Sequence, residues 1–128
     1  MNVVDSSAWL EYFAGGVNAE FFAAAIEDTG DLIVPTLSLH EVFKTILQQR
    51  TEDEALQAIA VMQQGQVQEL DPKLALRAAR LSIELKLPLA DSLMLATARE
   101  HESTFWTQDS HFEGIPGVKY TVPSECSG

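Results

Sequence analysis

Four carboxylates stand at positions where they could share one cation. Asp5 comes directly after a first apolar strand-like segment, and Asp109 comes just after a late one. Glu41 lies in the first turns of a helix expected after a second strand, and Asp91 opens a later helix. Converging carboxylates repel each other and raise one another's pKa values unless a cation lies between them. An all-oxygen site that keeps several waters suits Mg²⁺, with Mn²⁺ as a plausible substitute.

Each of these acids also has a local explanation. Asp5 and Asp91 are each suited to cap the N-terminus of a helix, where a carboxylate is favoured by the helix dipole. Ser38-x-x-Glu41 has the spacing of a capping box. Asp109 is a common residue type in turns. Taken singly, the local role is the simpler explanation, so the metal site depends on the four acids acting as a set.

The elements that must position these acids follow from the spacing of apolar residues. Strands are expected near residues 1–4, 31–34, 67–70, 104–107 and 118–122, and helices over 6–14, 18–29, 36–50, 52–64, 71–86 and 90–101. Their alternation indicates an α/β fold with three layers, a central, mainly parallel sheet of four to five strands flanked by helices. Ligands of such sheets bind beyond the carboxyl ends of the strands, so Asp5, Glu41 and Asp109 are expected at one edge. Asp91 joins them only if its helix begins at that edge.

The size and composition of the chain favour one intracellular domain. With 128 residues, 46% of them hydrophobic, we expect a single domain over residues 1–128, with 122–128 as a flexible tail. No apolar run approaches the roughly 20 residues that cross a bilayer, and the first residues lack the pattern of a signal peptide. The single cysteine, Cys126, cannot form an internal disulfide. A cytoplasmic protein without a membrane segment is the expectation.

The net charge of −11 limits the classes of nucleic-acid partner. A passive RNA- or DNA-binding protein needs basic surface to displace counterions, so this class is disfavoured. A metal-dependent nuclease is less affected, because metal ions bridge carboxylates and phosphate. The charge also suits a basic protein partner.

Four short segments containing the acids occur in a set order along the chain. They are Val3-Val4-Asp5-Ser6-Ser7, Ser38-Leu39-His40-Glu41, the run from Leu87 to Ala98 that includes Pro88-Leu89-Ala90-Asp91-Ser92, and Trp106-Thr107-Gln108-Asp109-Ser110-His111-Phe112. Together they resemble the motifs of the PIN-domain ribonucleases, in particular the VapC toxins of type II toxin–antitoxin systems. The resemblance covers essentially the whole chain. One departure is His111, because many relatives carry another acid there, and this weakens the case for a second metal ion.

The resemblance implies a Mg²⁺-dependent endoribonuclease with a PIN-like fold. Asp5, Asp91 and Asp109 would hold one ion, and Glu41 would bind a second ion or orient the attacking water. Water activated by the metal would then hydrolyse an RNA phosphodiester and leave a 5′-phosphate. The family further implies a cognate antitoxin and a homodimer, and it leaves open whether tRNA, ribosomal RNA or mRNA is cut.

Several other side chains are candidates for supporting roles. Ser6 and Thr107 flank the acids and are expected to hydrogen-bond them, although local capping explains both equally well. Three cations are candidates for contacts with RNA phosphates, with a solvated surface as the alternative: Lys44, Arg77 and Arg80.

Other functions fit the chain less well. A haloacid-dehalogenase-like phosphatase also begins with an Asp after the first strand, but it needs a second Asp where Ser7 stands. A response-regulator receiver needs a lysine at the end of a late strand, whereas Lys119 falls inside the last expected strand. A catalytically inactive PIN-fold module that binds a partner is a third alternative, and the intact set of acids argues against it.

Overall fold

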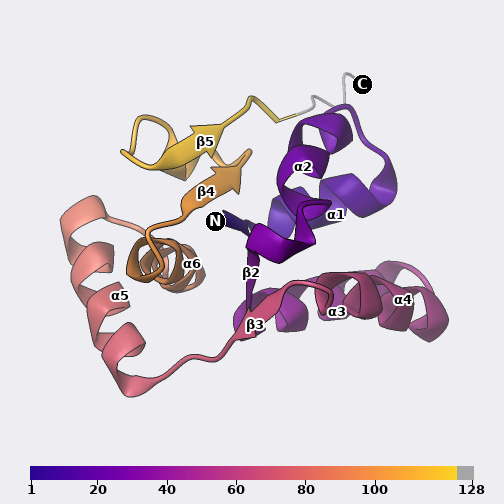
Figure 1. The fold of residues 1–128 in the computed structure, drawn as a ribbon, viewed down its shortest axis with the longest axis horizontal. Helices are drawn as coiled ribbons and strands as arrows, with labels where there is room; N and C mark the ends of the chain where they lie inside the picture. The colour runs from indigo at the N-terminus through magenta and orange to yellow at the C-terminus, as the bar shows by residue number, and fades with distance from the viewer. Residues whose placement is uncertain (124–128) are drawn as a thin grey trace.

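A parallel five-stranded sheet forms the centre of the computed structural model, which describes residues 1–123 (Figure 1). The strands are β1 (Asn2–Val4), β2 (Leu32–Pro35), β3 (Gln66–Gln68), β4 (Thr104–Thr107) and β5 (Val118–Tyr120). Their order across the sheet is β3-β2-β1-β4-β5. The predicted α/β class with a mainly parallel sheet is therefore confirmed. The sheet has five strands, within the expected range of four to five.

This strand order creates a crevice beside the first strand. From β1 the chain adds β2 and β3 on one side, then returns to place β4 and β5 on the other side. Because the winding direction reverses between β1 and β4, their connections leave in opposite directions and open a space beyond their carboxyl ends. The two strands are in register there, since Val4 pairs with Trp106 and the amide of Asp5 donates to the Trp106 carbonyl at 2.9 Å.

Six α-helices and two short 3₁₀ helices connect the strands. They are α1 (Ser6–Ala14), α2 (Ala19–Ile26), η1 (Thr29–Asp31), α3 (Thr36–Gln49), α4 (Glu52–Met62), α5 (Pro72–Leu85), α6 (Leu89–Glu100) and η2 (Ser110–Phe112). Most bounds lie within two residues of the expected ones. The main difference is the helix predicted over 18–29, which ends at Ile26 and is followed by the separate turn η1. Asp28 and Gly30 lie at that break, and both residue types favour turns over helix interiors.

The sheet is covered on both faces, and alternate residues of each strand supply the two cores. Val3 and Phe105 pack with α5, α6 and Phe112 on one face. Val4 and Val34 pack on the other face with apolar side chains of α1 to α4. The period of two along a strand thus builds the three layers that the sequence predicts. In Figure 1, α5 and α6 lie together on one side, while α3 and α4 form a helical hairpin on the other.

Two sequence predictions concern features beyond this core. Among residues 1–123, no helix has both the length and the apolar character needed to span a bilayer. The flexible tail predicted for 122–128 falls mostly outside the described residues, as does Cys126. Within the described part, the carbonyl of Val122 accepts a hydrogen bond from Asn18 Nδ2 at 2.8 Å.

Candidate metal centre

Three helices begin at the edge of the sheet where the strands end. α1 follows β1 directly and α3 follows β2, so both start at the carboxyl edge. α6 precedes β4, and it therefore runs back across the sheet and also has its N-terminus at this edge. Helix N-termini carry partial positive charge, which favours carboxylates beside them. The condition set for Asp91, that its helix begin at this edge, is met.

Asp5 is the most buried of the four acids, with 6% of its surface exposed. Its Oδ1 accepts from the Ser6 amide at 2.8 Å, so the predicted N-cap role is realised. Its Oδ2 accepts from Thr107 Oγ1 at 2.8 Å and from Ser7 Oγ at 3.4 Å. The pKa of Asp5 is raised from 3.8 to about 6, mainly by burial; the hydrogen bonds from Thr107 and the Ser6 amide lower it, and the charges of Asp91 and Asp109 raise it.

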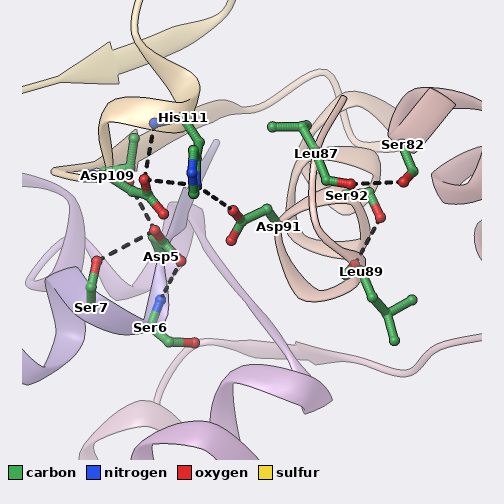
Figure 2. A network of polar contacts seen from close by, with 11 residues as sticks. Asp5, Ser6, Ser7, Ser82, Leu87, Leu89, Asp91, Ser92, Asp109 and His111 are labelled. Carbon is green, nitrogen blue, oxygen red and sulfur yellow. Dashed lines mark hydrogen bonds and ion pairs between the residues drawn. The ribbon is translucent and has the colours of Figure 1, made fainter. Parts of the chain in front are cut away.

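Asp91 and Asp109 meet on either side of the His111 ring (Figure 2). His111 Nδ1 lies 3.2 Å from Asp109 Oδ1 and 3.3 Å from Asp91 Oδ2. One ligand atom from each of the three residues lies within 4.8 Å of the other two. Two further hydrogen bonds position Asp109. Its amide donates to Thr107 Oγ1 at 2.9 Å, and its Oδ1 accepts from the His111 amide at 2.9 Å.

The loop before α6 aims Asp91 at this cluster. Ser82 Oγ donates to the Leu87 carbonyl at 2.7 Å, and Ser92 Oγ donates to the Leu89 carbonyl at 2.7 Å (Figure 2). Asp91 itself is not the cap, because the helix begins at Leu89 with Pro88 before it. Burial raises the pKa of Asp91, and the charge of Asp109 adds to that shift while the neighbouring His111 opposes it.

Glu41 joins the cluster through Ser6. Ser6 Oγ donates to Glu41 Oε1 at 2.6 Å, and the charge of Glu41 contributes to raising the pKa of Asp91. The capping box considered for Ser38 and Glu41 is wrong, because α3 already begins at Thr36, two residues before the position that a capping serine would occupy. Ser38 is instead buried, with its Oγ 3.2 Å from Met94 Sδ.

The structure thus brings Asp91 and Asp109 together around His111, and it places Asp5 and Glu41 beside them through the two predicted supporting residues, Thr107 and Ser6. The three candidate cations are all exposed, Lys44 on α3 and both Arg77 and Arg80 on α5.

In the sequence, His111 replaces an acid carried by many relatives, and its position two residues after Asp109 suggests that it lies close to the acids. In the structure its ring lies among the acids, because η2 begins immediately after Asp109 and turns the side chain of residue 111 back toward them. The sequence contains a pattern that indicates this placement of His111. An Asp two residues before a His, just after a strand, is compatible with a turn that the Asp caps.

The donor set fits a divalent cation. Asp91 and Asp109 each offer an oxygen and His111 offers a nitrogen within 4.8 Å of one another, while Asp5 and Glu41 stand next to this group, held by Thr107 and Ser6. Burial and the neighbouring carboxylates raise the pKa values of Asp5 and Asp91, so added positive charge would favour the ionised form of both groups. A divalent ion would supply that charge, and Mg²⁺ or Mn²⁺ suits carboxylate ligands.

A groove of about 760 Å³ lies beside the cluster. Its walls come from α1, α3 and α4, and they combine apolar side chains such as Phe13, Ile46 and Val61 with charged ones. Ser7 and Gln108 also line it, and each is next to a residue of the cluster or bonded to one. At these two residues the groove therefore lies next to the cluster.

Comparison with known proteins gives one family and a consistent set of folds. The family model described as PIN domain matches residues 3–118. No curated protein sequence matches the chain. A toxin–antitoxin complex from Klebsiella pneumoniae contains a similar chain, with a TM-score of 0.80, 23% identity and coverage of 93% of this chain and 96% of that chain.

Two other solved structures are also similar in fold. VapBC2 from Rickettsia felis, bound to a DNA fragment from its promoter, has a TM-score of 0.72 at 11% identity and covers 94% of this chain and 97% of that chain. VapC20 from Mycobacterium tuberculosis, a toxin that cleaves the sarcin–ricin loop, has a TM-score of 0.67 at 17% identity and covers 81% and 85%. At these identities the likeness is one of fold.

Proposed function

This chain belongs to the PIN-domain family, and from that premise we propose that it is a divalent-metal-dependent endoribonuclease, the toxin of a toxin–antitoxin pair. The observation that carries the proposal is the gathering of Asp5, Asp91 and Asp109 at the crevice beyond β1 and β4, with Glu41 joined through Ser6. The sarcin–ricin-loop-cleaving neighbour supports RNA as the substrate class. Membership of this family also sets aside the haloacid-dehalogenase alternative.

The mechanism divides the work among these side chains. Asp5, Asp91 and Asp109 would hold Mg²⁺, or Mn²⁺ in its place. When bound, such an ion would supply activation of a water molecule and stabilisation of negative charge on the phosphate. Thr107 and the Ser6 amide keep Asp5 oriented, and Glu41, held by Ser6 Oγ, orients the attacking water and takes its proton. Cleavage in this sense leaves a 5′-phosphate and a 3′-hydroxyl.

The test is cleavage of labelled RNA by purified protein with Mg²⁺, with Mn²⁺ and with EDTA. We expect Asp91→Asn and Asp5→Asn to lose activity by a factor on the order of 100 or more, because each removes a metal ligand. Asp31→Asn, an exposed acid on η1, is the matched control and retains activity. Full activity of both Asp91→Asn and Asp5→Asn, or full activity of the wild-type protein in EDTA, would contradict the proposal. A wild-type protein inert with both metals would favour the non-catalytic module.

The partner we propose is a small antitoxin whose chain lies in the groove between α1, α3 and α4 and whose basic side chains reach the acids. The net charge of −11 suits a basic partner, and the Klebsiella pneumoniae neighbour was solved as a toxin–antitoxin complex. The product of the adjacent open reading frame supplies the test. Gln57→Trp places a bulky side chain in the groove and is expected to weaken binding of that product about tenfold or more.

The matched control is Gln63→Trp, which adds the same side chain at an exposed position of α4's C-terminal end outside the groove. Equal affinity in both variants would place the partner elsewhere. An adjacent product that neither binds the wild-type protein nor suppresses RNA cleavage would refute the antitoxin itself.

A homodimer acting in the cytoplasm completes the proposal. α5 offers a surface for self-association, since Leu76 and Ile83 are 67% and 82% exposed one above the other on that helix. Light scattering on the purified protein is expected to give twice the 14.1 kDa of one chain. Leu76→Glu with Ile83→Glu should halve the mass if α5 is the contact.

A further inference from the structure

An imidazole lies inside the carboxylate cluster, and core packing does not require it there. The His111 side chain is 58% exposed, so burial of the ring is not what holds it in place. Its backbone is fixed by the acid it faces, because Asp109 Oδ1 accepts from the His111 amide at 2.9 Å. The ring is therefore presented to Asp91 and Asp109 by the turn η2 (Figure 2).

The distances match neighbouring positions around one ion. Two ligands about 2.1 Å from an octahedral cation lie about 3.0 Å apart when adjacent and about 4.2 Å apart when opposite. His111 Nδ1 is 3.2 Å from Asp109 Oδ1 and 3.3 Å from Asp91 Oδ2. The imidazole nitrogen therefore lies at the separation expected of a neighbouring ligand from each of the two carboxylate oxygens.

We propose that His111 is a direct nitrogen ligand of the catalytic ion and gives this centre a preference for Mn²⁺ over Mg²⁺. Nitrogen ligands bind first-row transition ions in an order that begins with Mn²⁺, the weakest of them, whereas Mg²⁺ favours oxygen ligands and keeps several waters, so an added imidazole should help Mn²⁺ more than Mg²⁺. A fourth-motif acid at this position would favour Mg²⁺ instead. The inference rests on the proposed metal-dependent function, but its test reads the coordination of the ion and needs no RNA.

The competing role for His111 is a hydrogen bond from the ring to a carboxylate. In that role the imidazole supports Asp91 or Asp109 from outside and never contacts the ion. Both roles agree with the distances alone, but only direct coordination places a nitrogen nucleus in the first shell of the metal.

Pulsed electron paramagnetic resonance on the full chain loaded with one equivalent of Mn²⁺ separates the two roles. We expect electron spin echo modulation from a directly coordinated ¹⁴N, changed by ¹⁵N-histidine labelling and lost in His111→Ala. His40→Ala, which removes an exposed histidine on α3, is the control and keeps the signal. Bound Mn²⁺ without nitrogen modulation would overturn the inference while leaving a metal-dependent nuclease intact.

Affinity measurements give the second readout. By calorimetry, His111→Ala is expected to weaken Mn²⁺ binding roughly 10-fold to 100-fold, while Mg²⁺ binding changes less than about threefold. His111→Asp should reverse the preference by tightening Mg²⁺. Equal losses for the two ions in His111→Ala would contradict a nitrogen ligand, and a wild-type chain that binds neither ion would refute this inference and the proposed metal centre together.

Discussion

At the scale of single residues, Asp5 combines a structural role with a chemical one. It caps α1 through the Ser6 amide, and it presents its second oxygen at the crevice between β1 and β4. The local explanation and the metal-site explanation of this residue were alternatives in the sequence. In the structure both hold, because the cap uses Oδ1 and Thr107 fixes Oδ2.

The burial of Asp5 predicts that the metal-free protein is destabilised when this carboxyl is ionised. Its folded pKa of about 6 lies above the ordinary 3.8, so the folded state holds the proton more tightly than the unfolded state. Stability therefore falls as pH rises from about 4 to about 6, and the cost is complete above that range. The difference between the two pKa values corresponds to about 3 kcal/mol at most.

Asp5→Asn should consequently raise the free energy of unfolding in EDTA at pH 8, by about 1–3 kcal/mol. The gain should be small near pH 4 and vanish near pH 3, below the unfolded pKa of 3.8, where the wild-type carboxyl is protonated in both states. Urea denaturation at these pH values measures it, with Asp31→Asn as the exposed control. A variant less stable than wild type at pH 8 would contradict the role given to Asp5 burial.

At the scale of elements, the site depends on how β1 and β4 are joined at their carboxyl ends. Thr107 ends β4, is fully buried, and links Asp5 to the amide of Asp109 through one hydroxyl. The two hydrogen bonds hold acids from distant parts of the chain in one arrangement. Thr107 therefore supports both the arrangement of β1 and β4 at their carboxyl ends and the candidate metal centre.

Thr107→Val keeps the shape of the side chain and removes its hydroxyl, so it is predicted to lower both the stability of the fold and the affinity for the metal ion. The Asp109 amide loses its acceptor, which should lower the free energy of unfolding by about 1–3 kcal/mol. Metal affinity should fall roughly 10-fold to 100-fold, because Asp5 is no longer oriented. Thr107→Ser retains the hydroxyl and serves as the control in urea denaturation and Mn²⁺ calorimetry. Identical behaviour of the Val and Ser variants would show that the hydroxyl is unimportant.

The type and order of the elements were predictable, because apolar spacing is a local property of the chain. The helix over Ser6–Ala14 and the strand over Thr104–Thr107 were predicted with the bounds observed. The capping box at Ser38 and Glu41 failed for a nonlocal reason. Ser38 is drawn into the core beside Met94, and Glu41 turns to Ser6, which is 35 residues away in sequence.

At the scale of the whole molecule, this acidic protein must bind RNA, which is itself negatively charged. With a net charge of −11, RNA binding depends on the few exposed cations near its path. Arg77 and Arg80 are exposed on α5, which packs against α6, the helix that carries Asp91. Arg77 remains a candidate for a phosphate contact, and Arg80 does so if the stripe of Leu76 and Ile83, on whose face it lies, is not the dimer contact.

Arg77→Gln and Arg80→Gln are each predicted to raise KM for RNA about threefold to tenfold with kcat unchanged. Each change should also lower the dependence of log KM on log salt by about 0.7, the contribution of one phosphate contact on a single strand. Arg99→Gln is the control, because it removes a charge from the last turn of α6, at the opposite end of that helix from Asp91. Steady-state cleavage at several KCl concentrations gives both quantities, and an unchanged KM and salt slope would assign the two arginines to plain solvated surface.

By itself, the sequence determined the α/β class, the order of the elements and the four carboxylates within recognisable motifs, because all of these are written in local periodicity and local spacing. Only the tertiary structure decided that β1 and β4 are neighbours, which places Asp5 against Thr107, 102 residues away. It also decided that His111 lies among the acids and that Ser6 holds Glu41. Those distances result from the packing of both faces of the sheet, to which residues throughout the chain contribute, so no short segment encodes them.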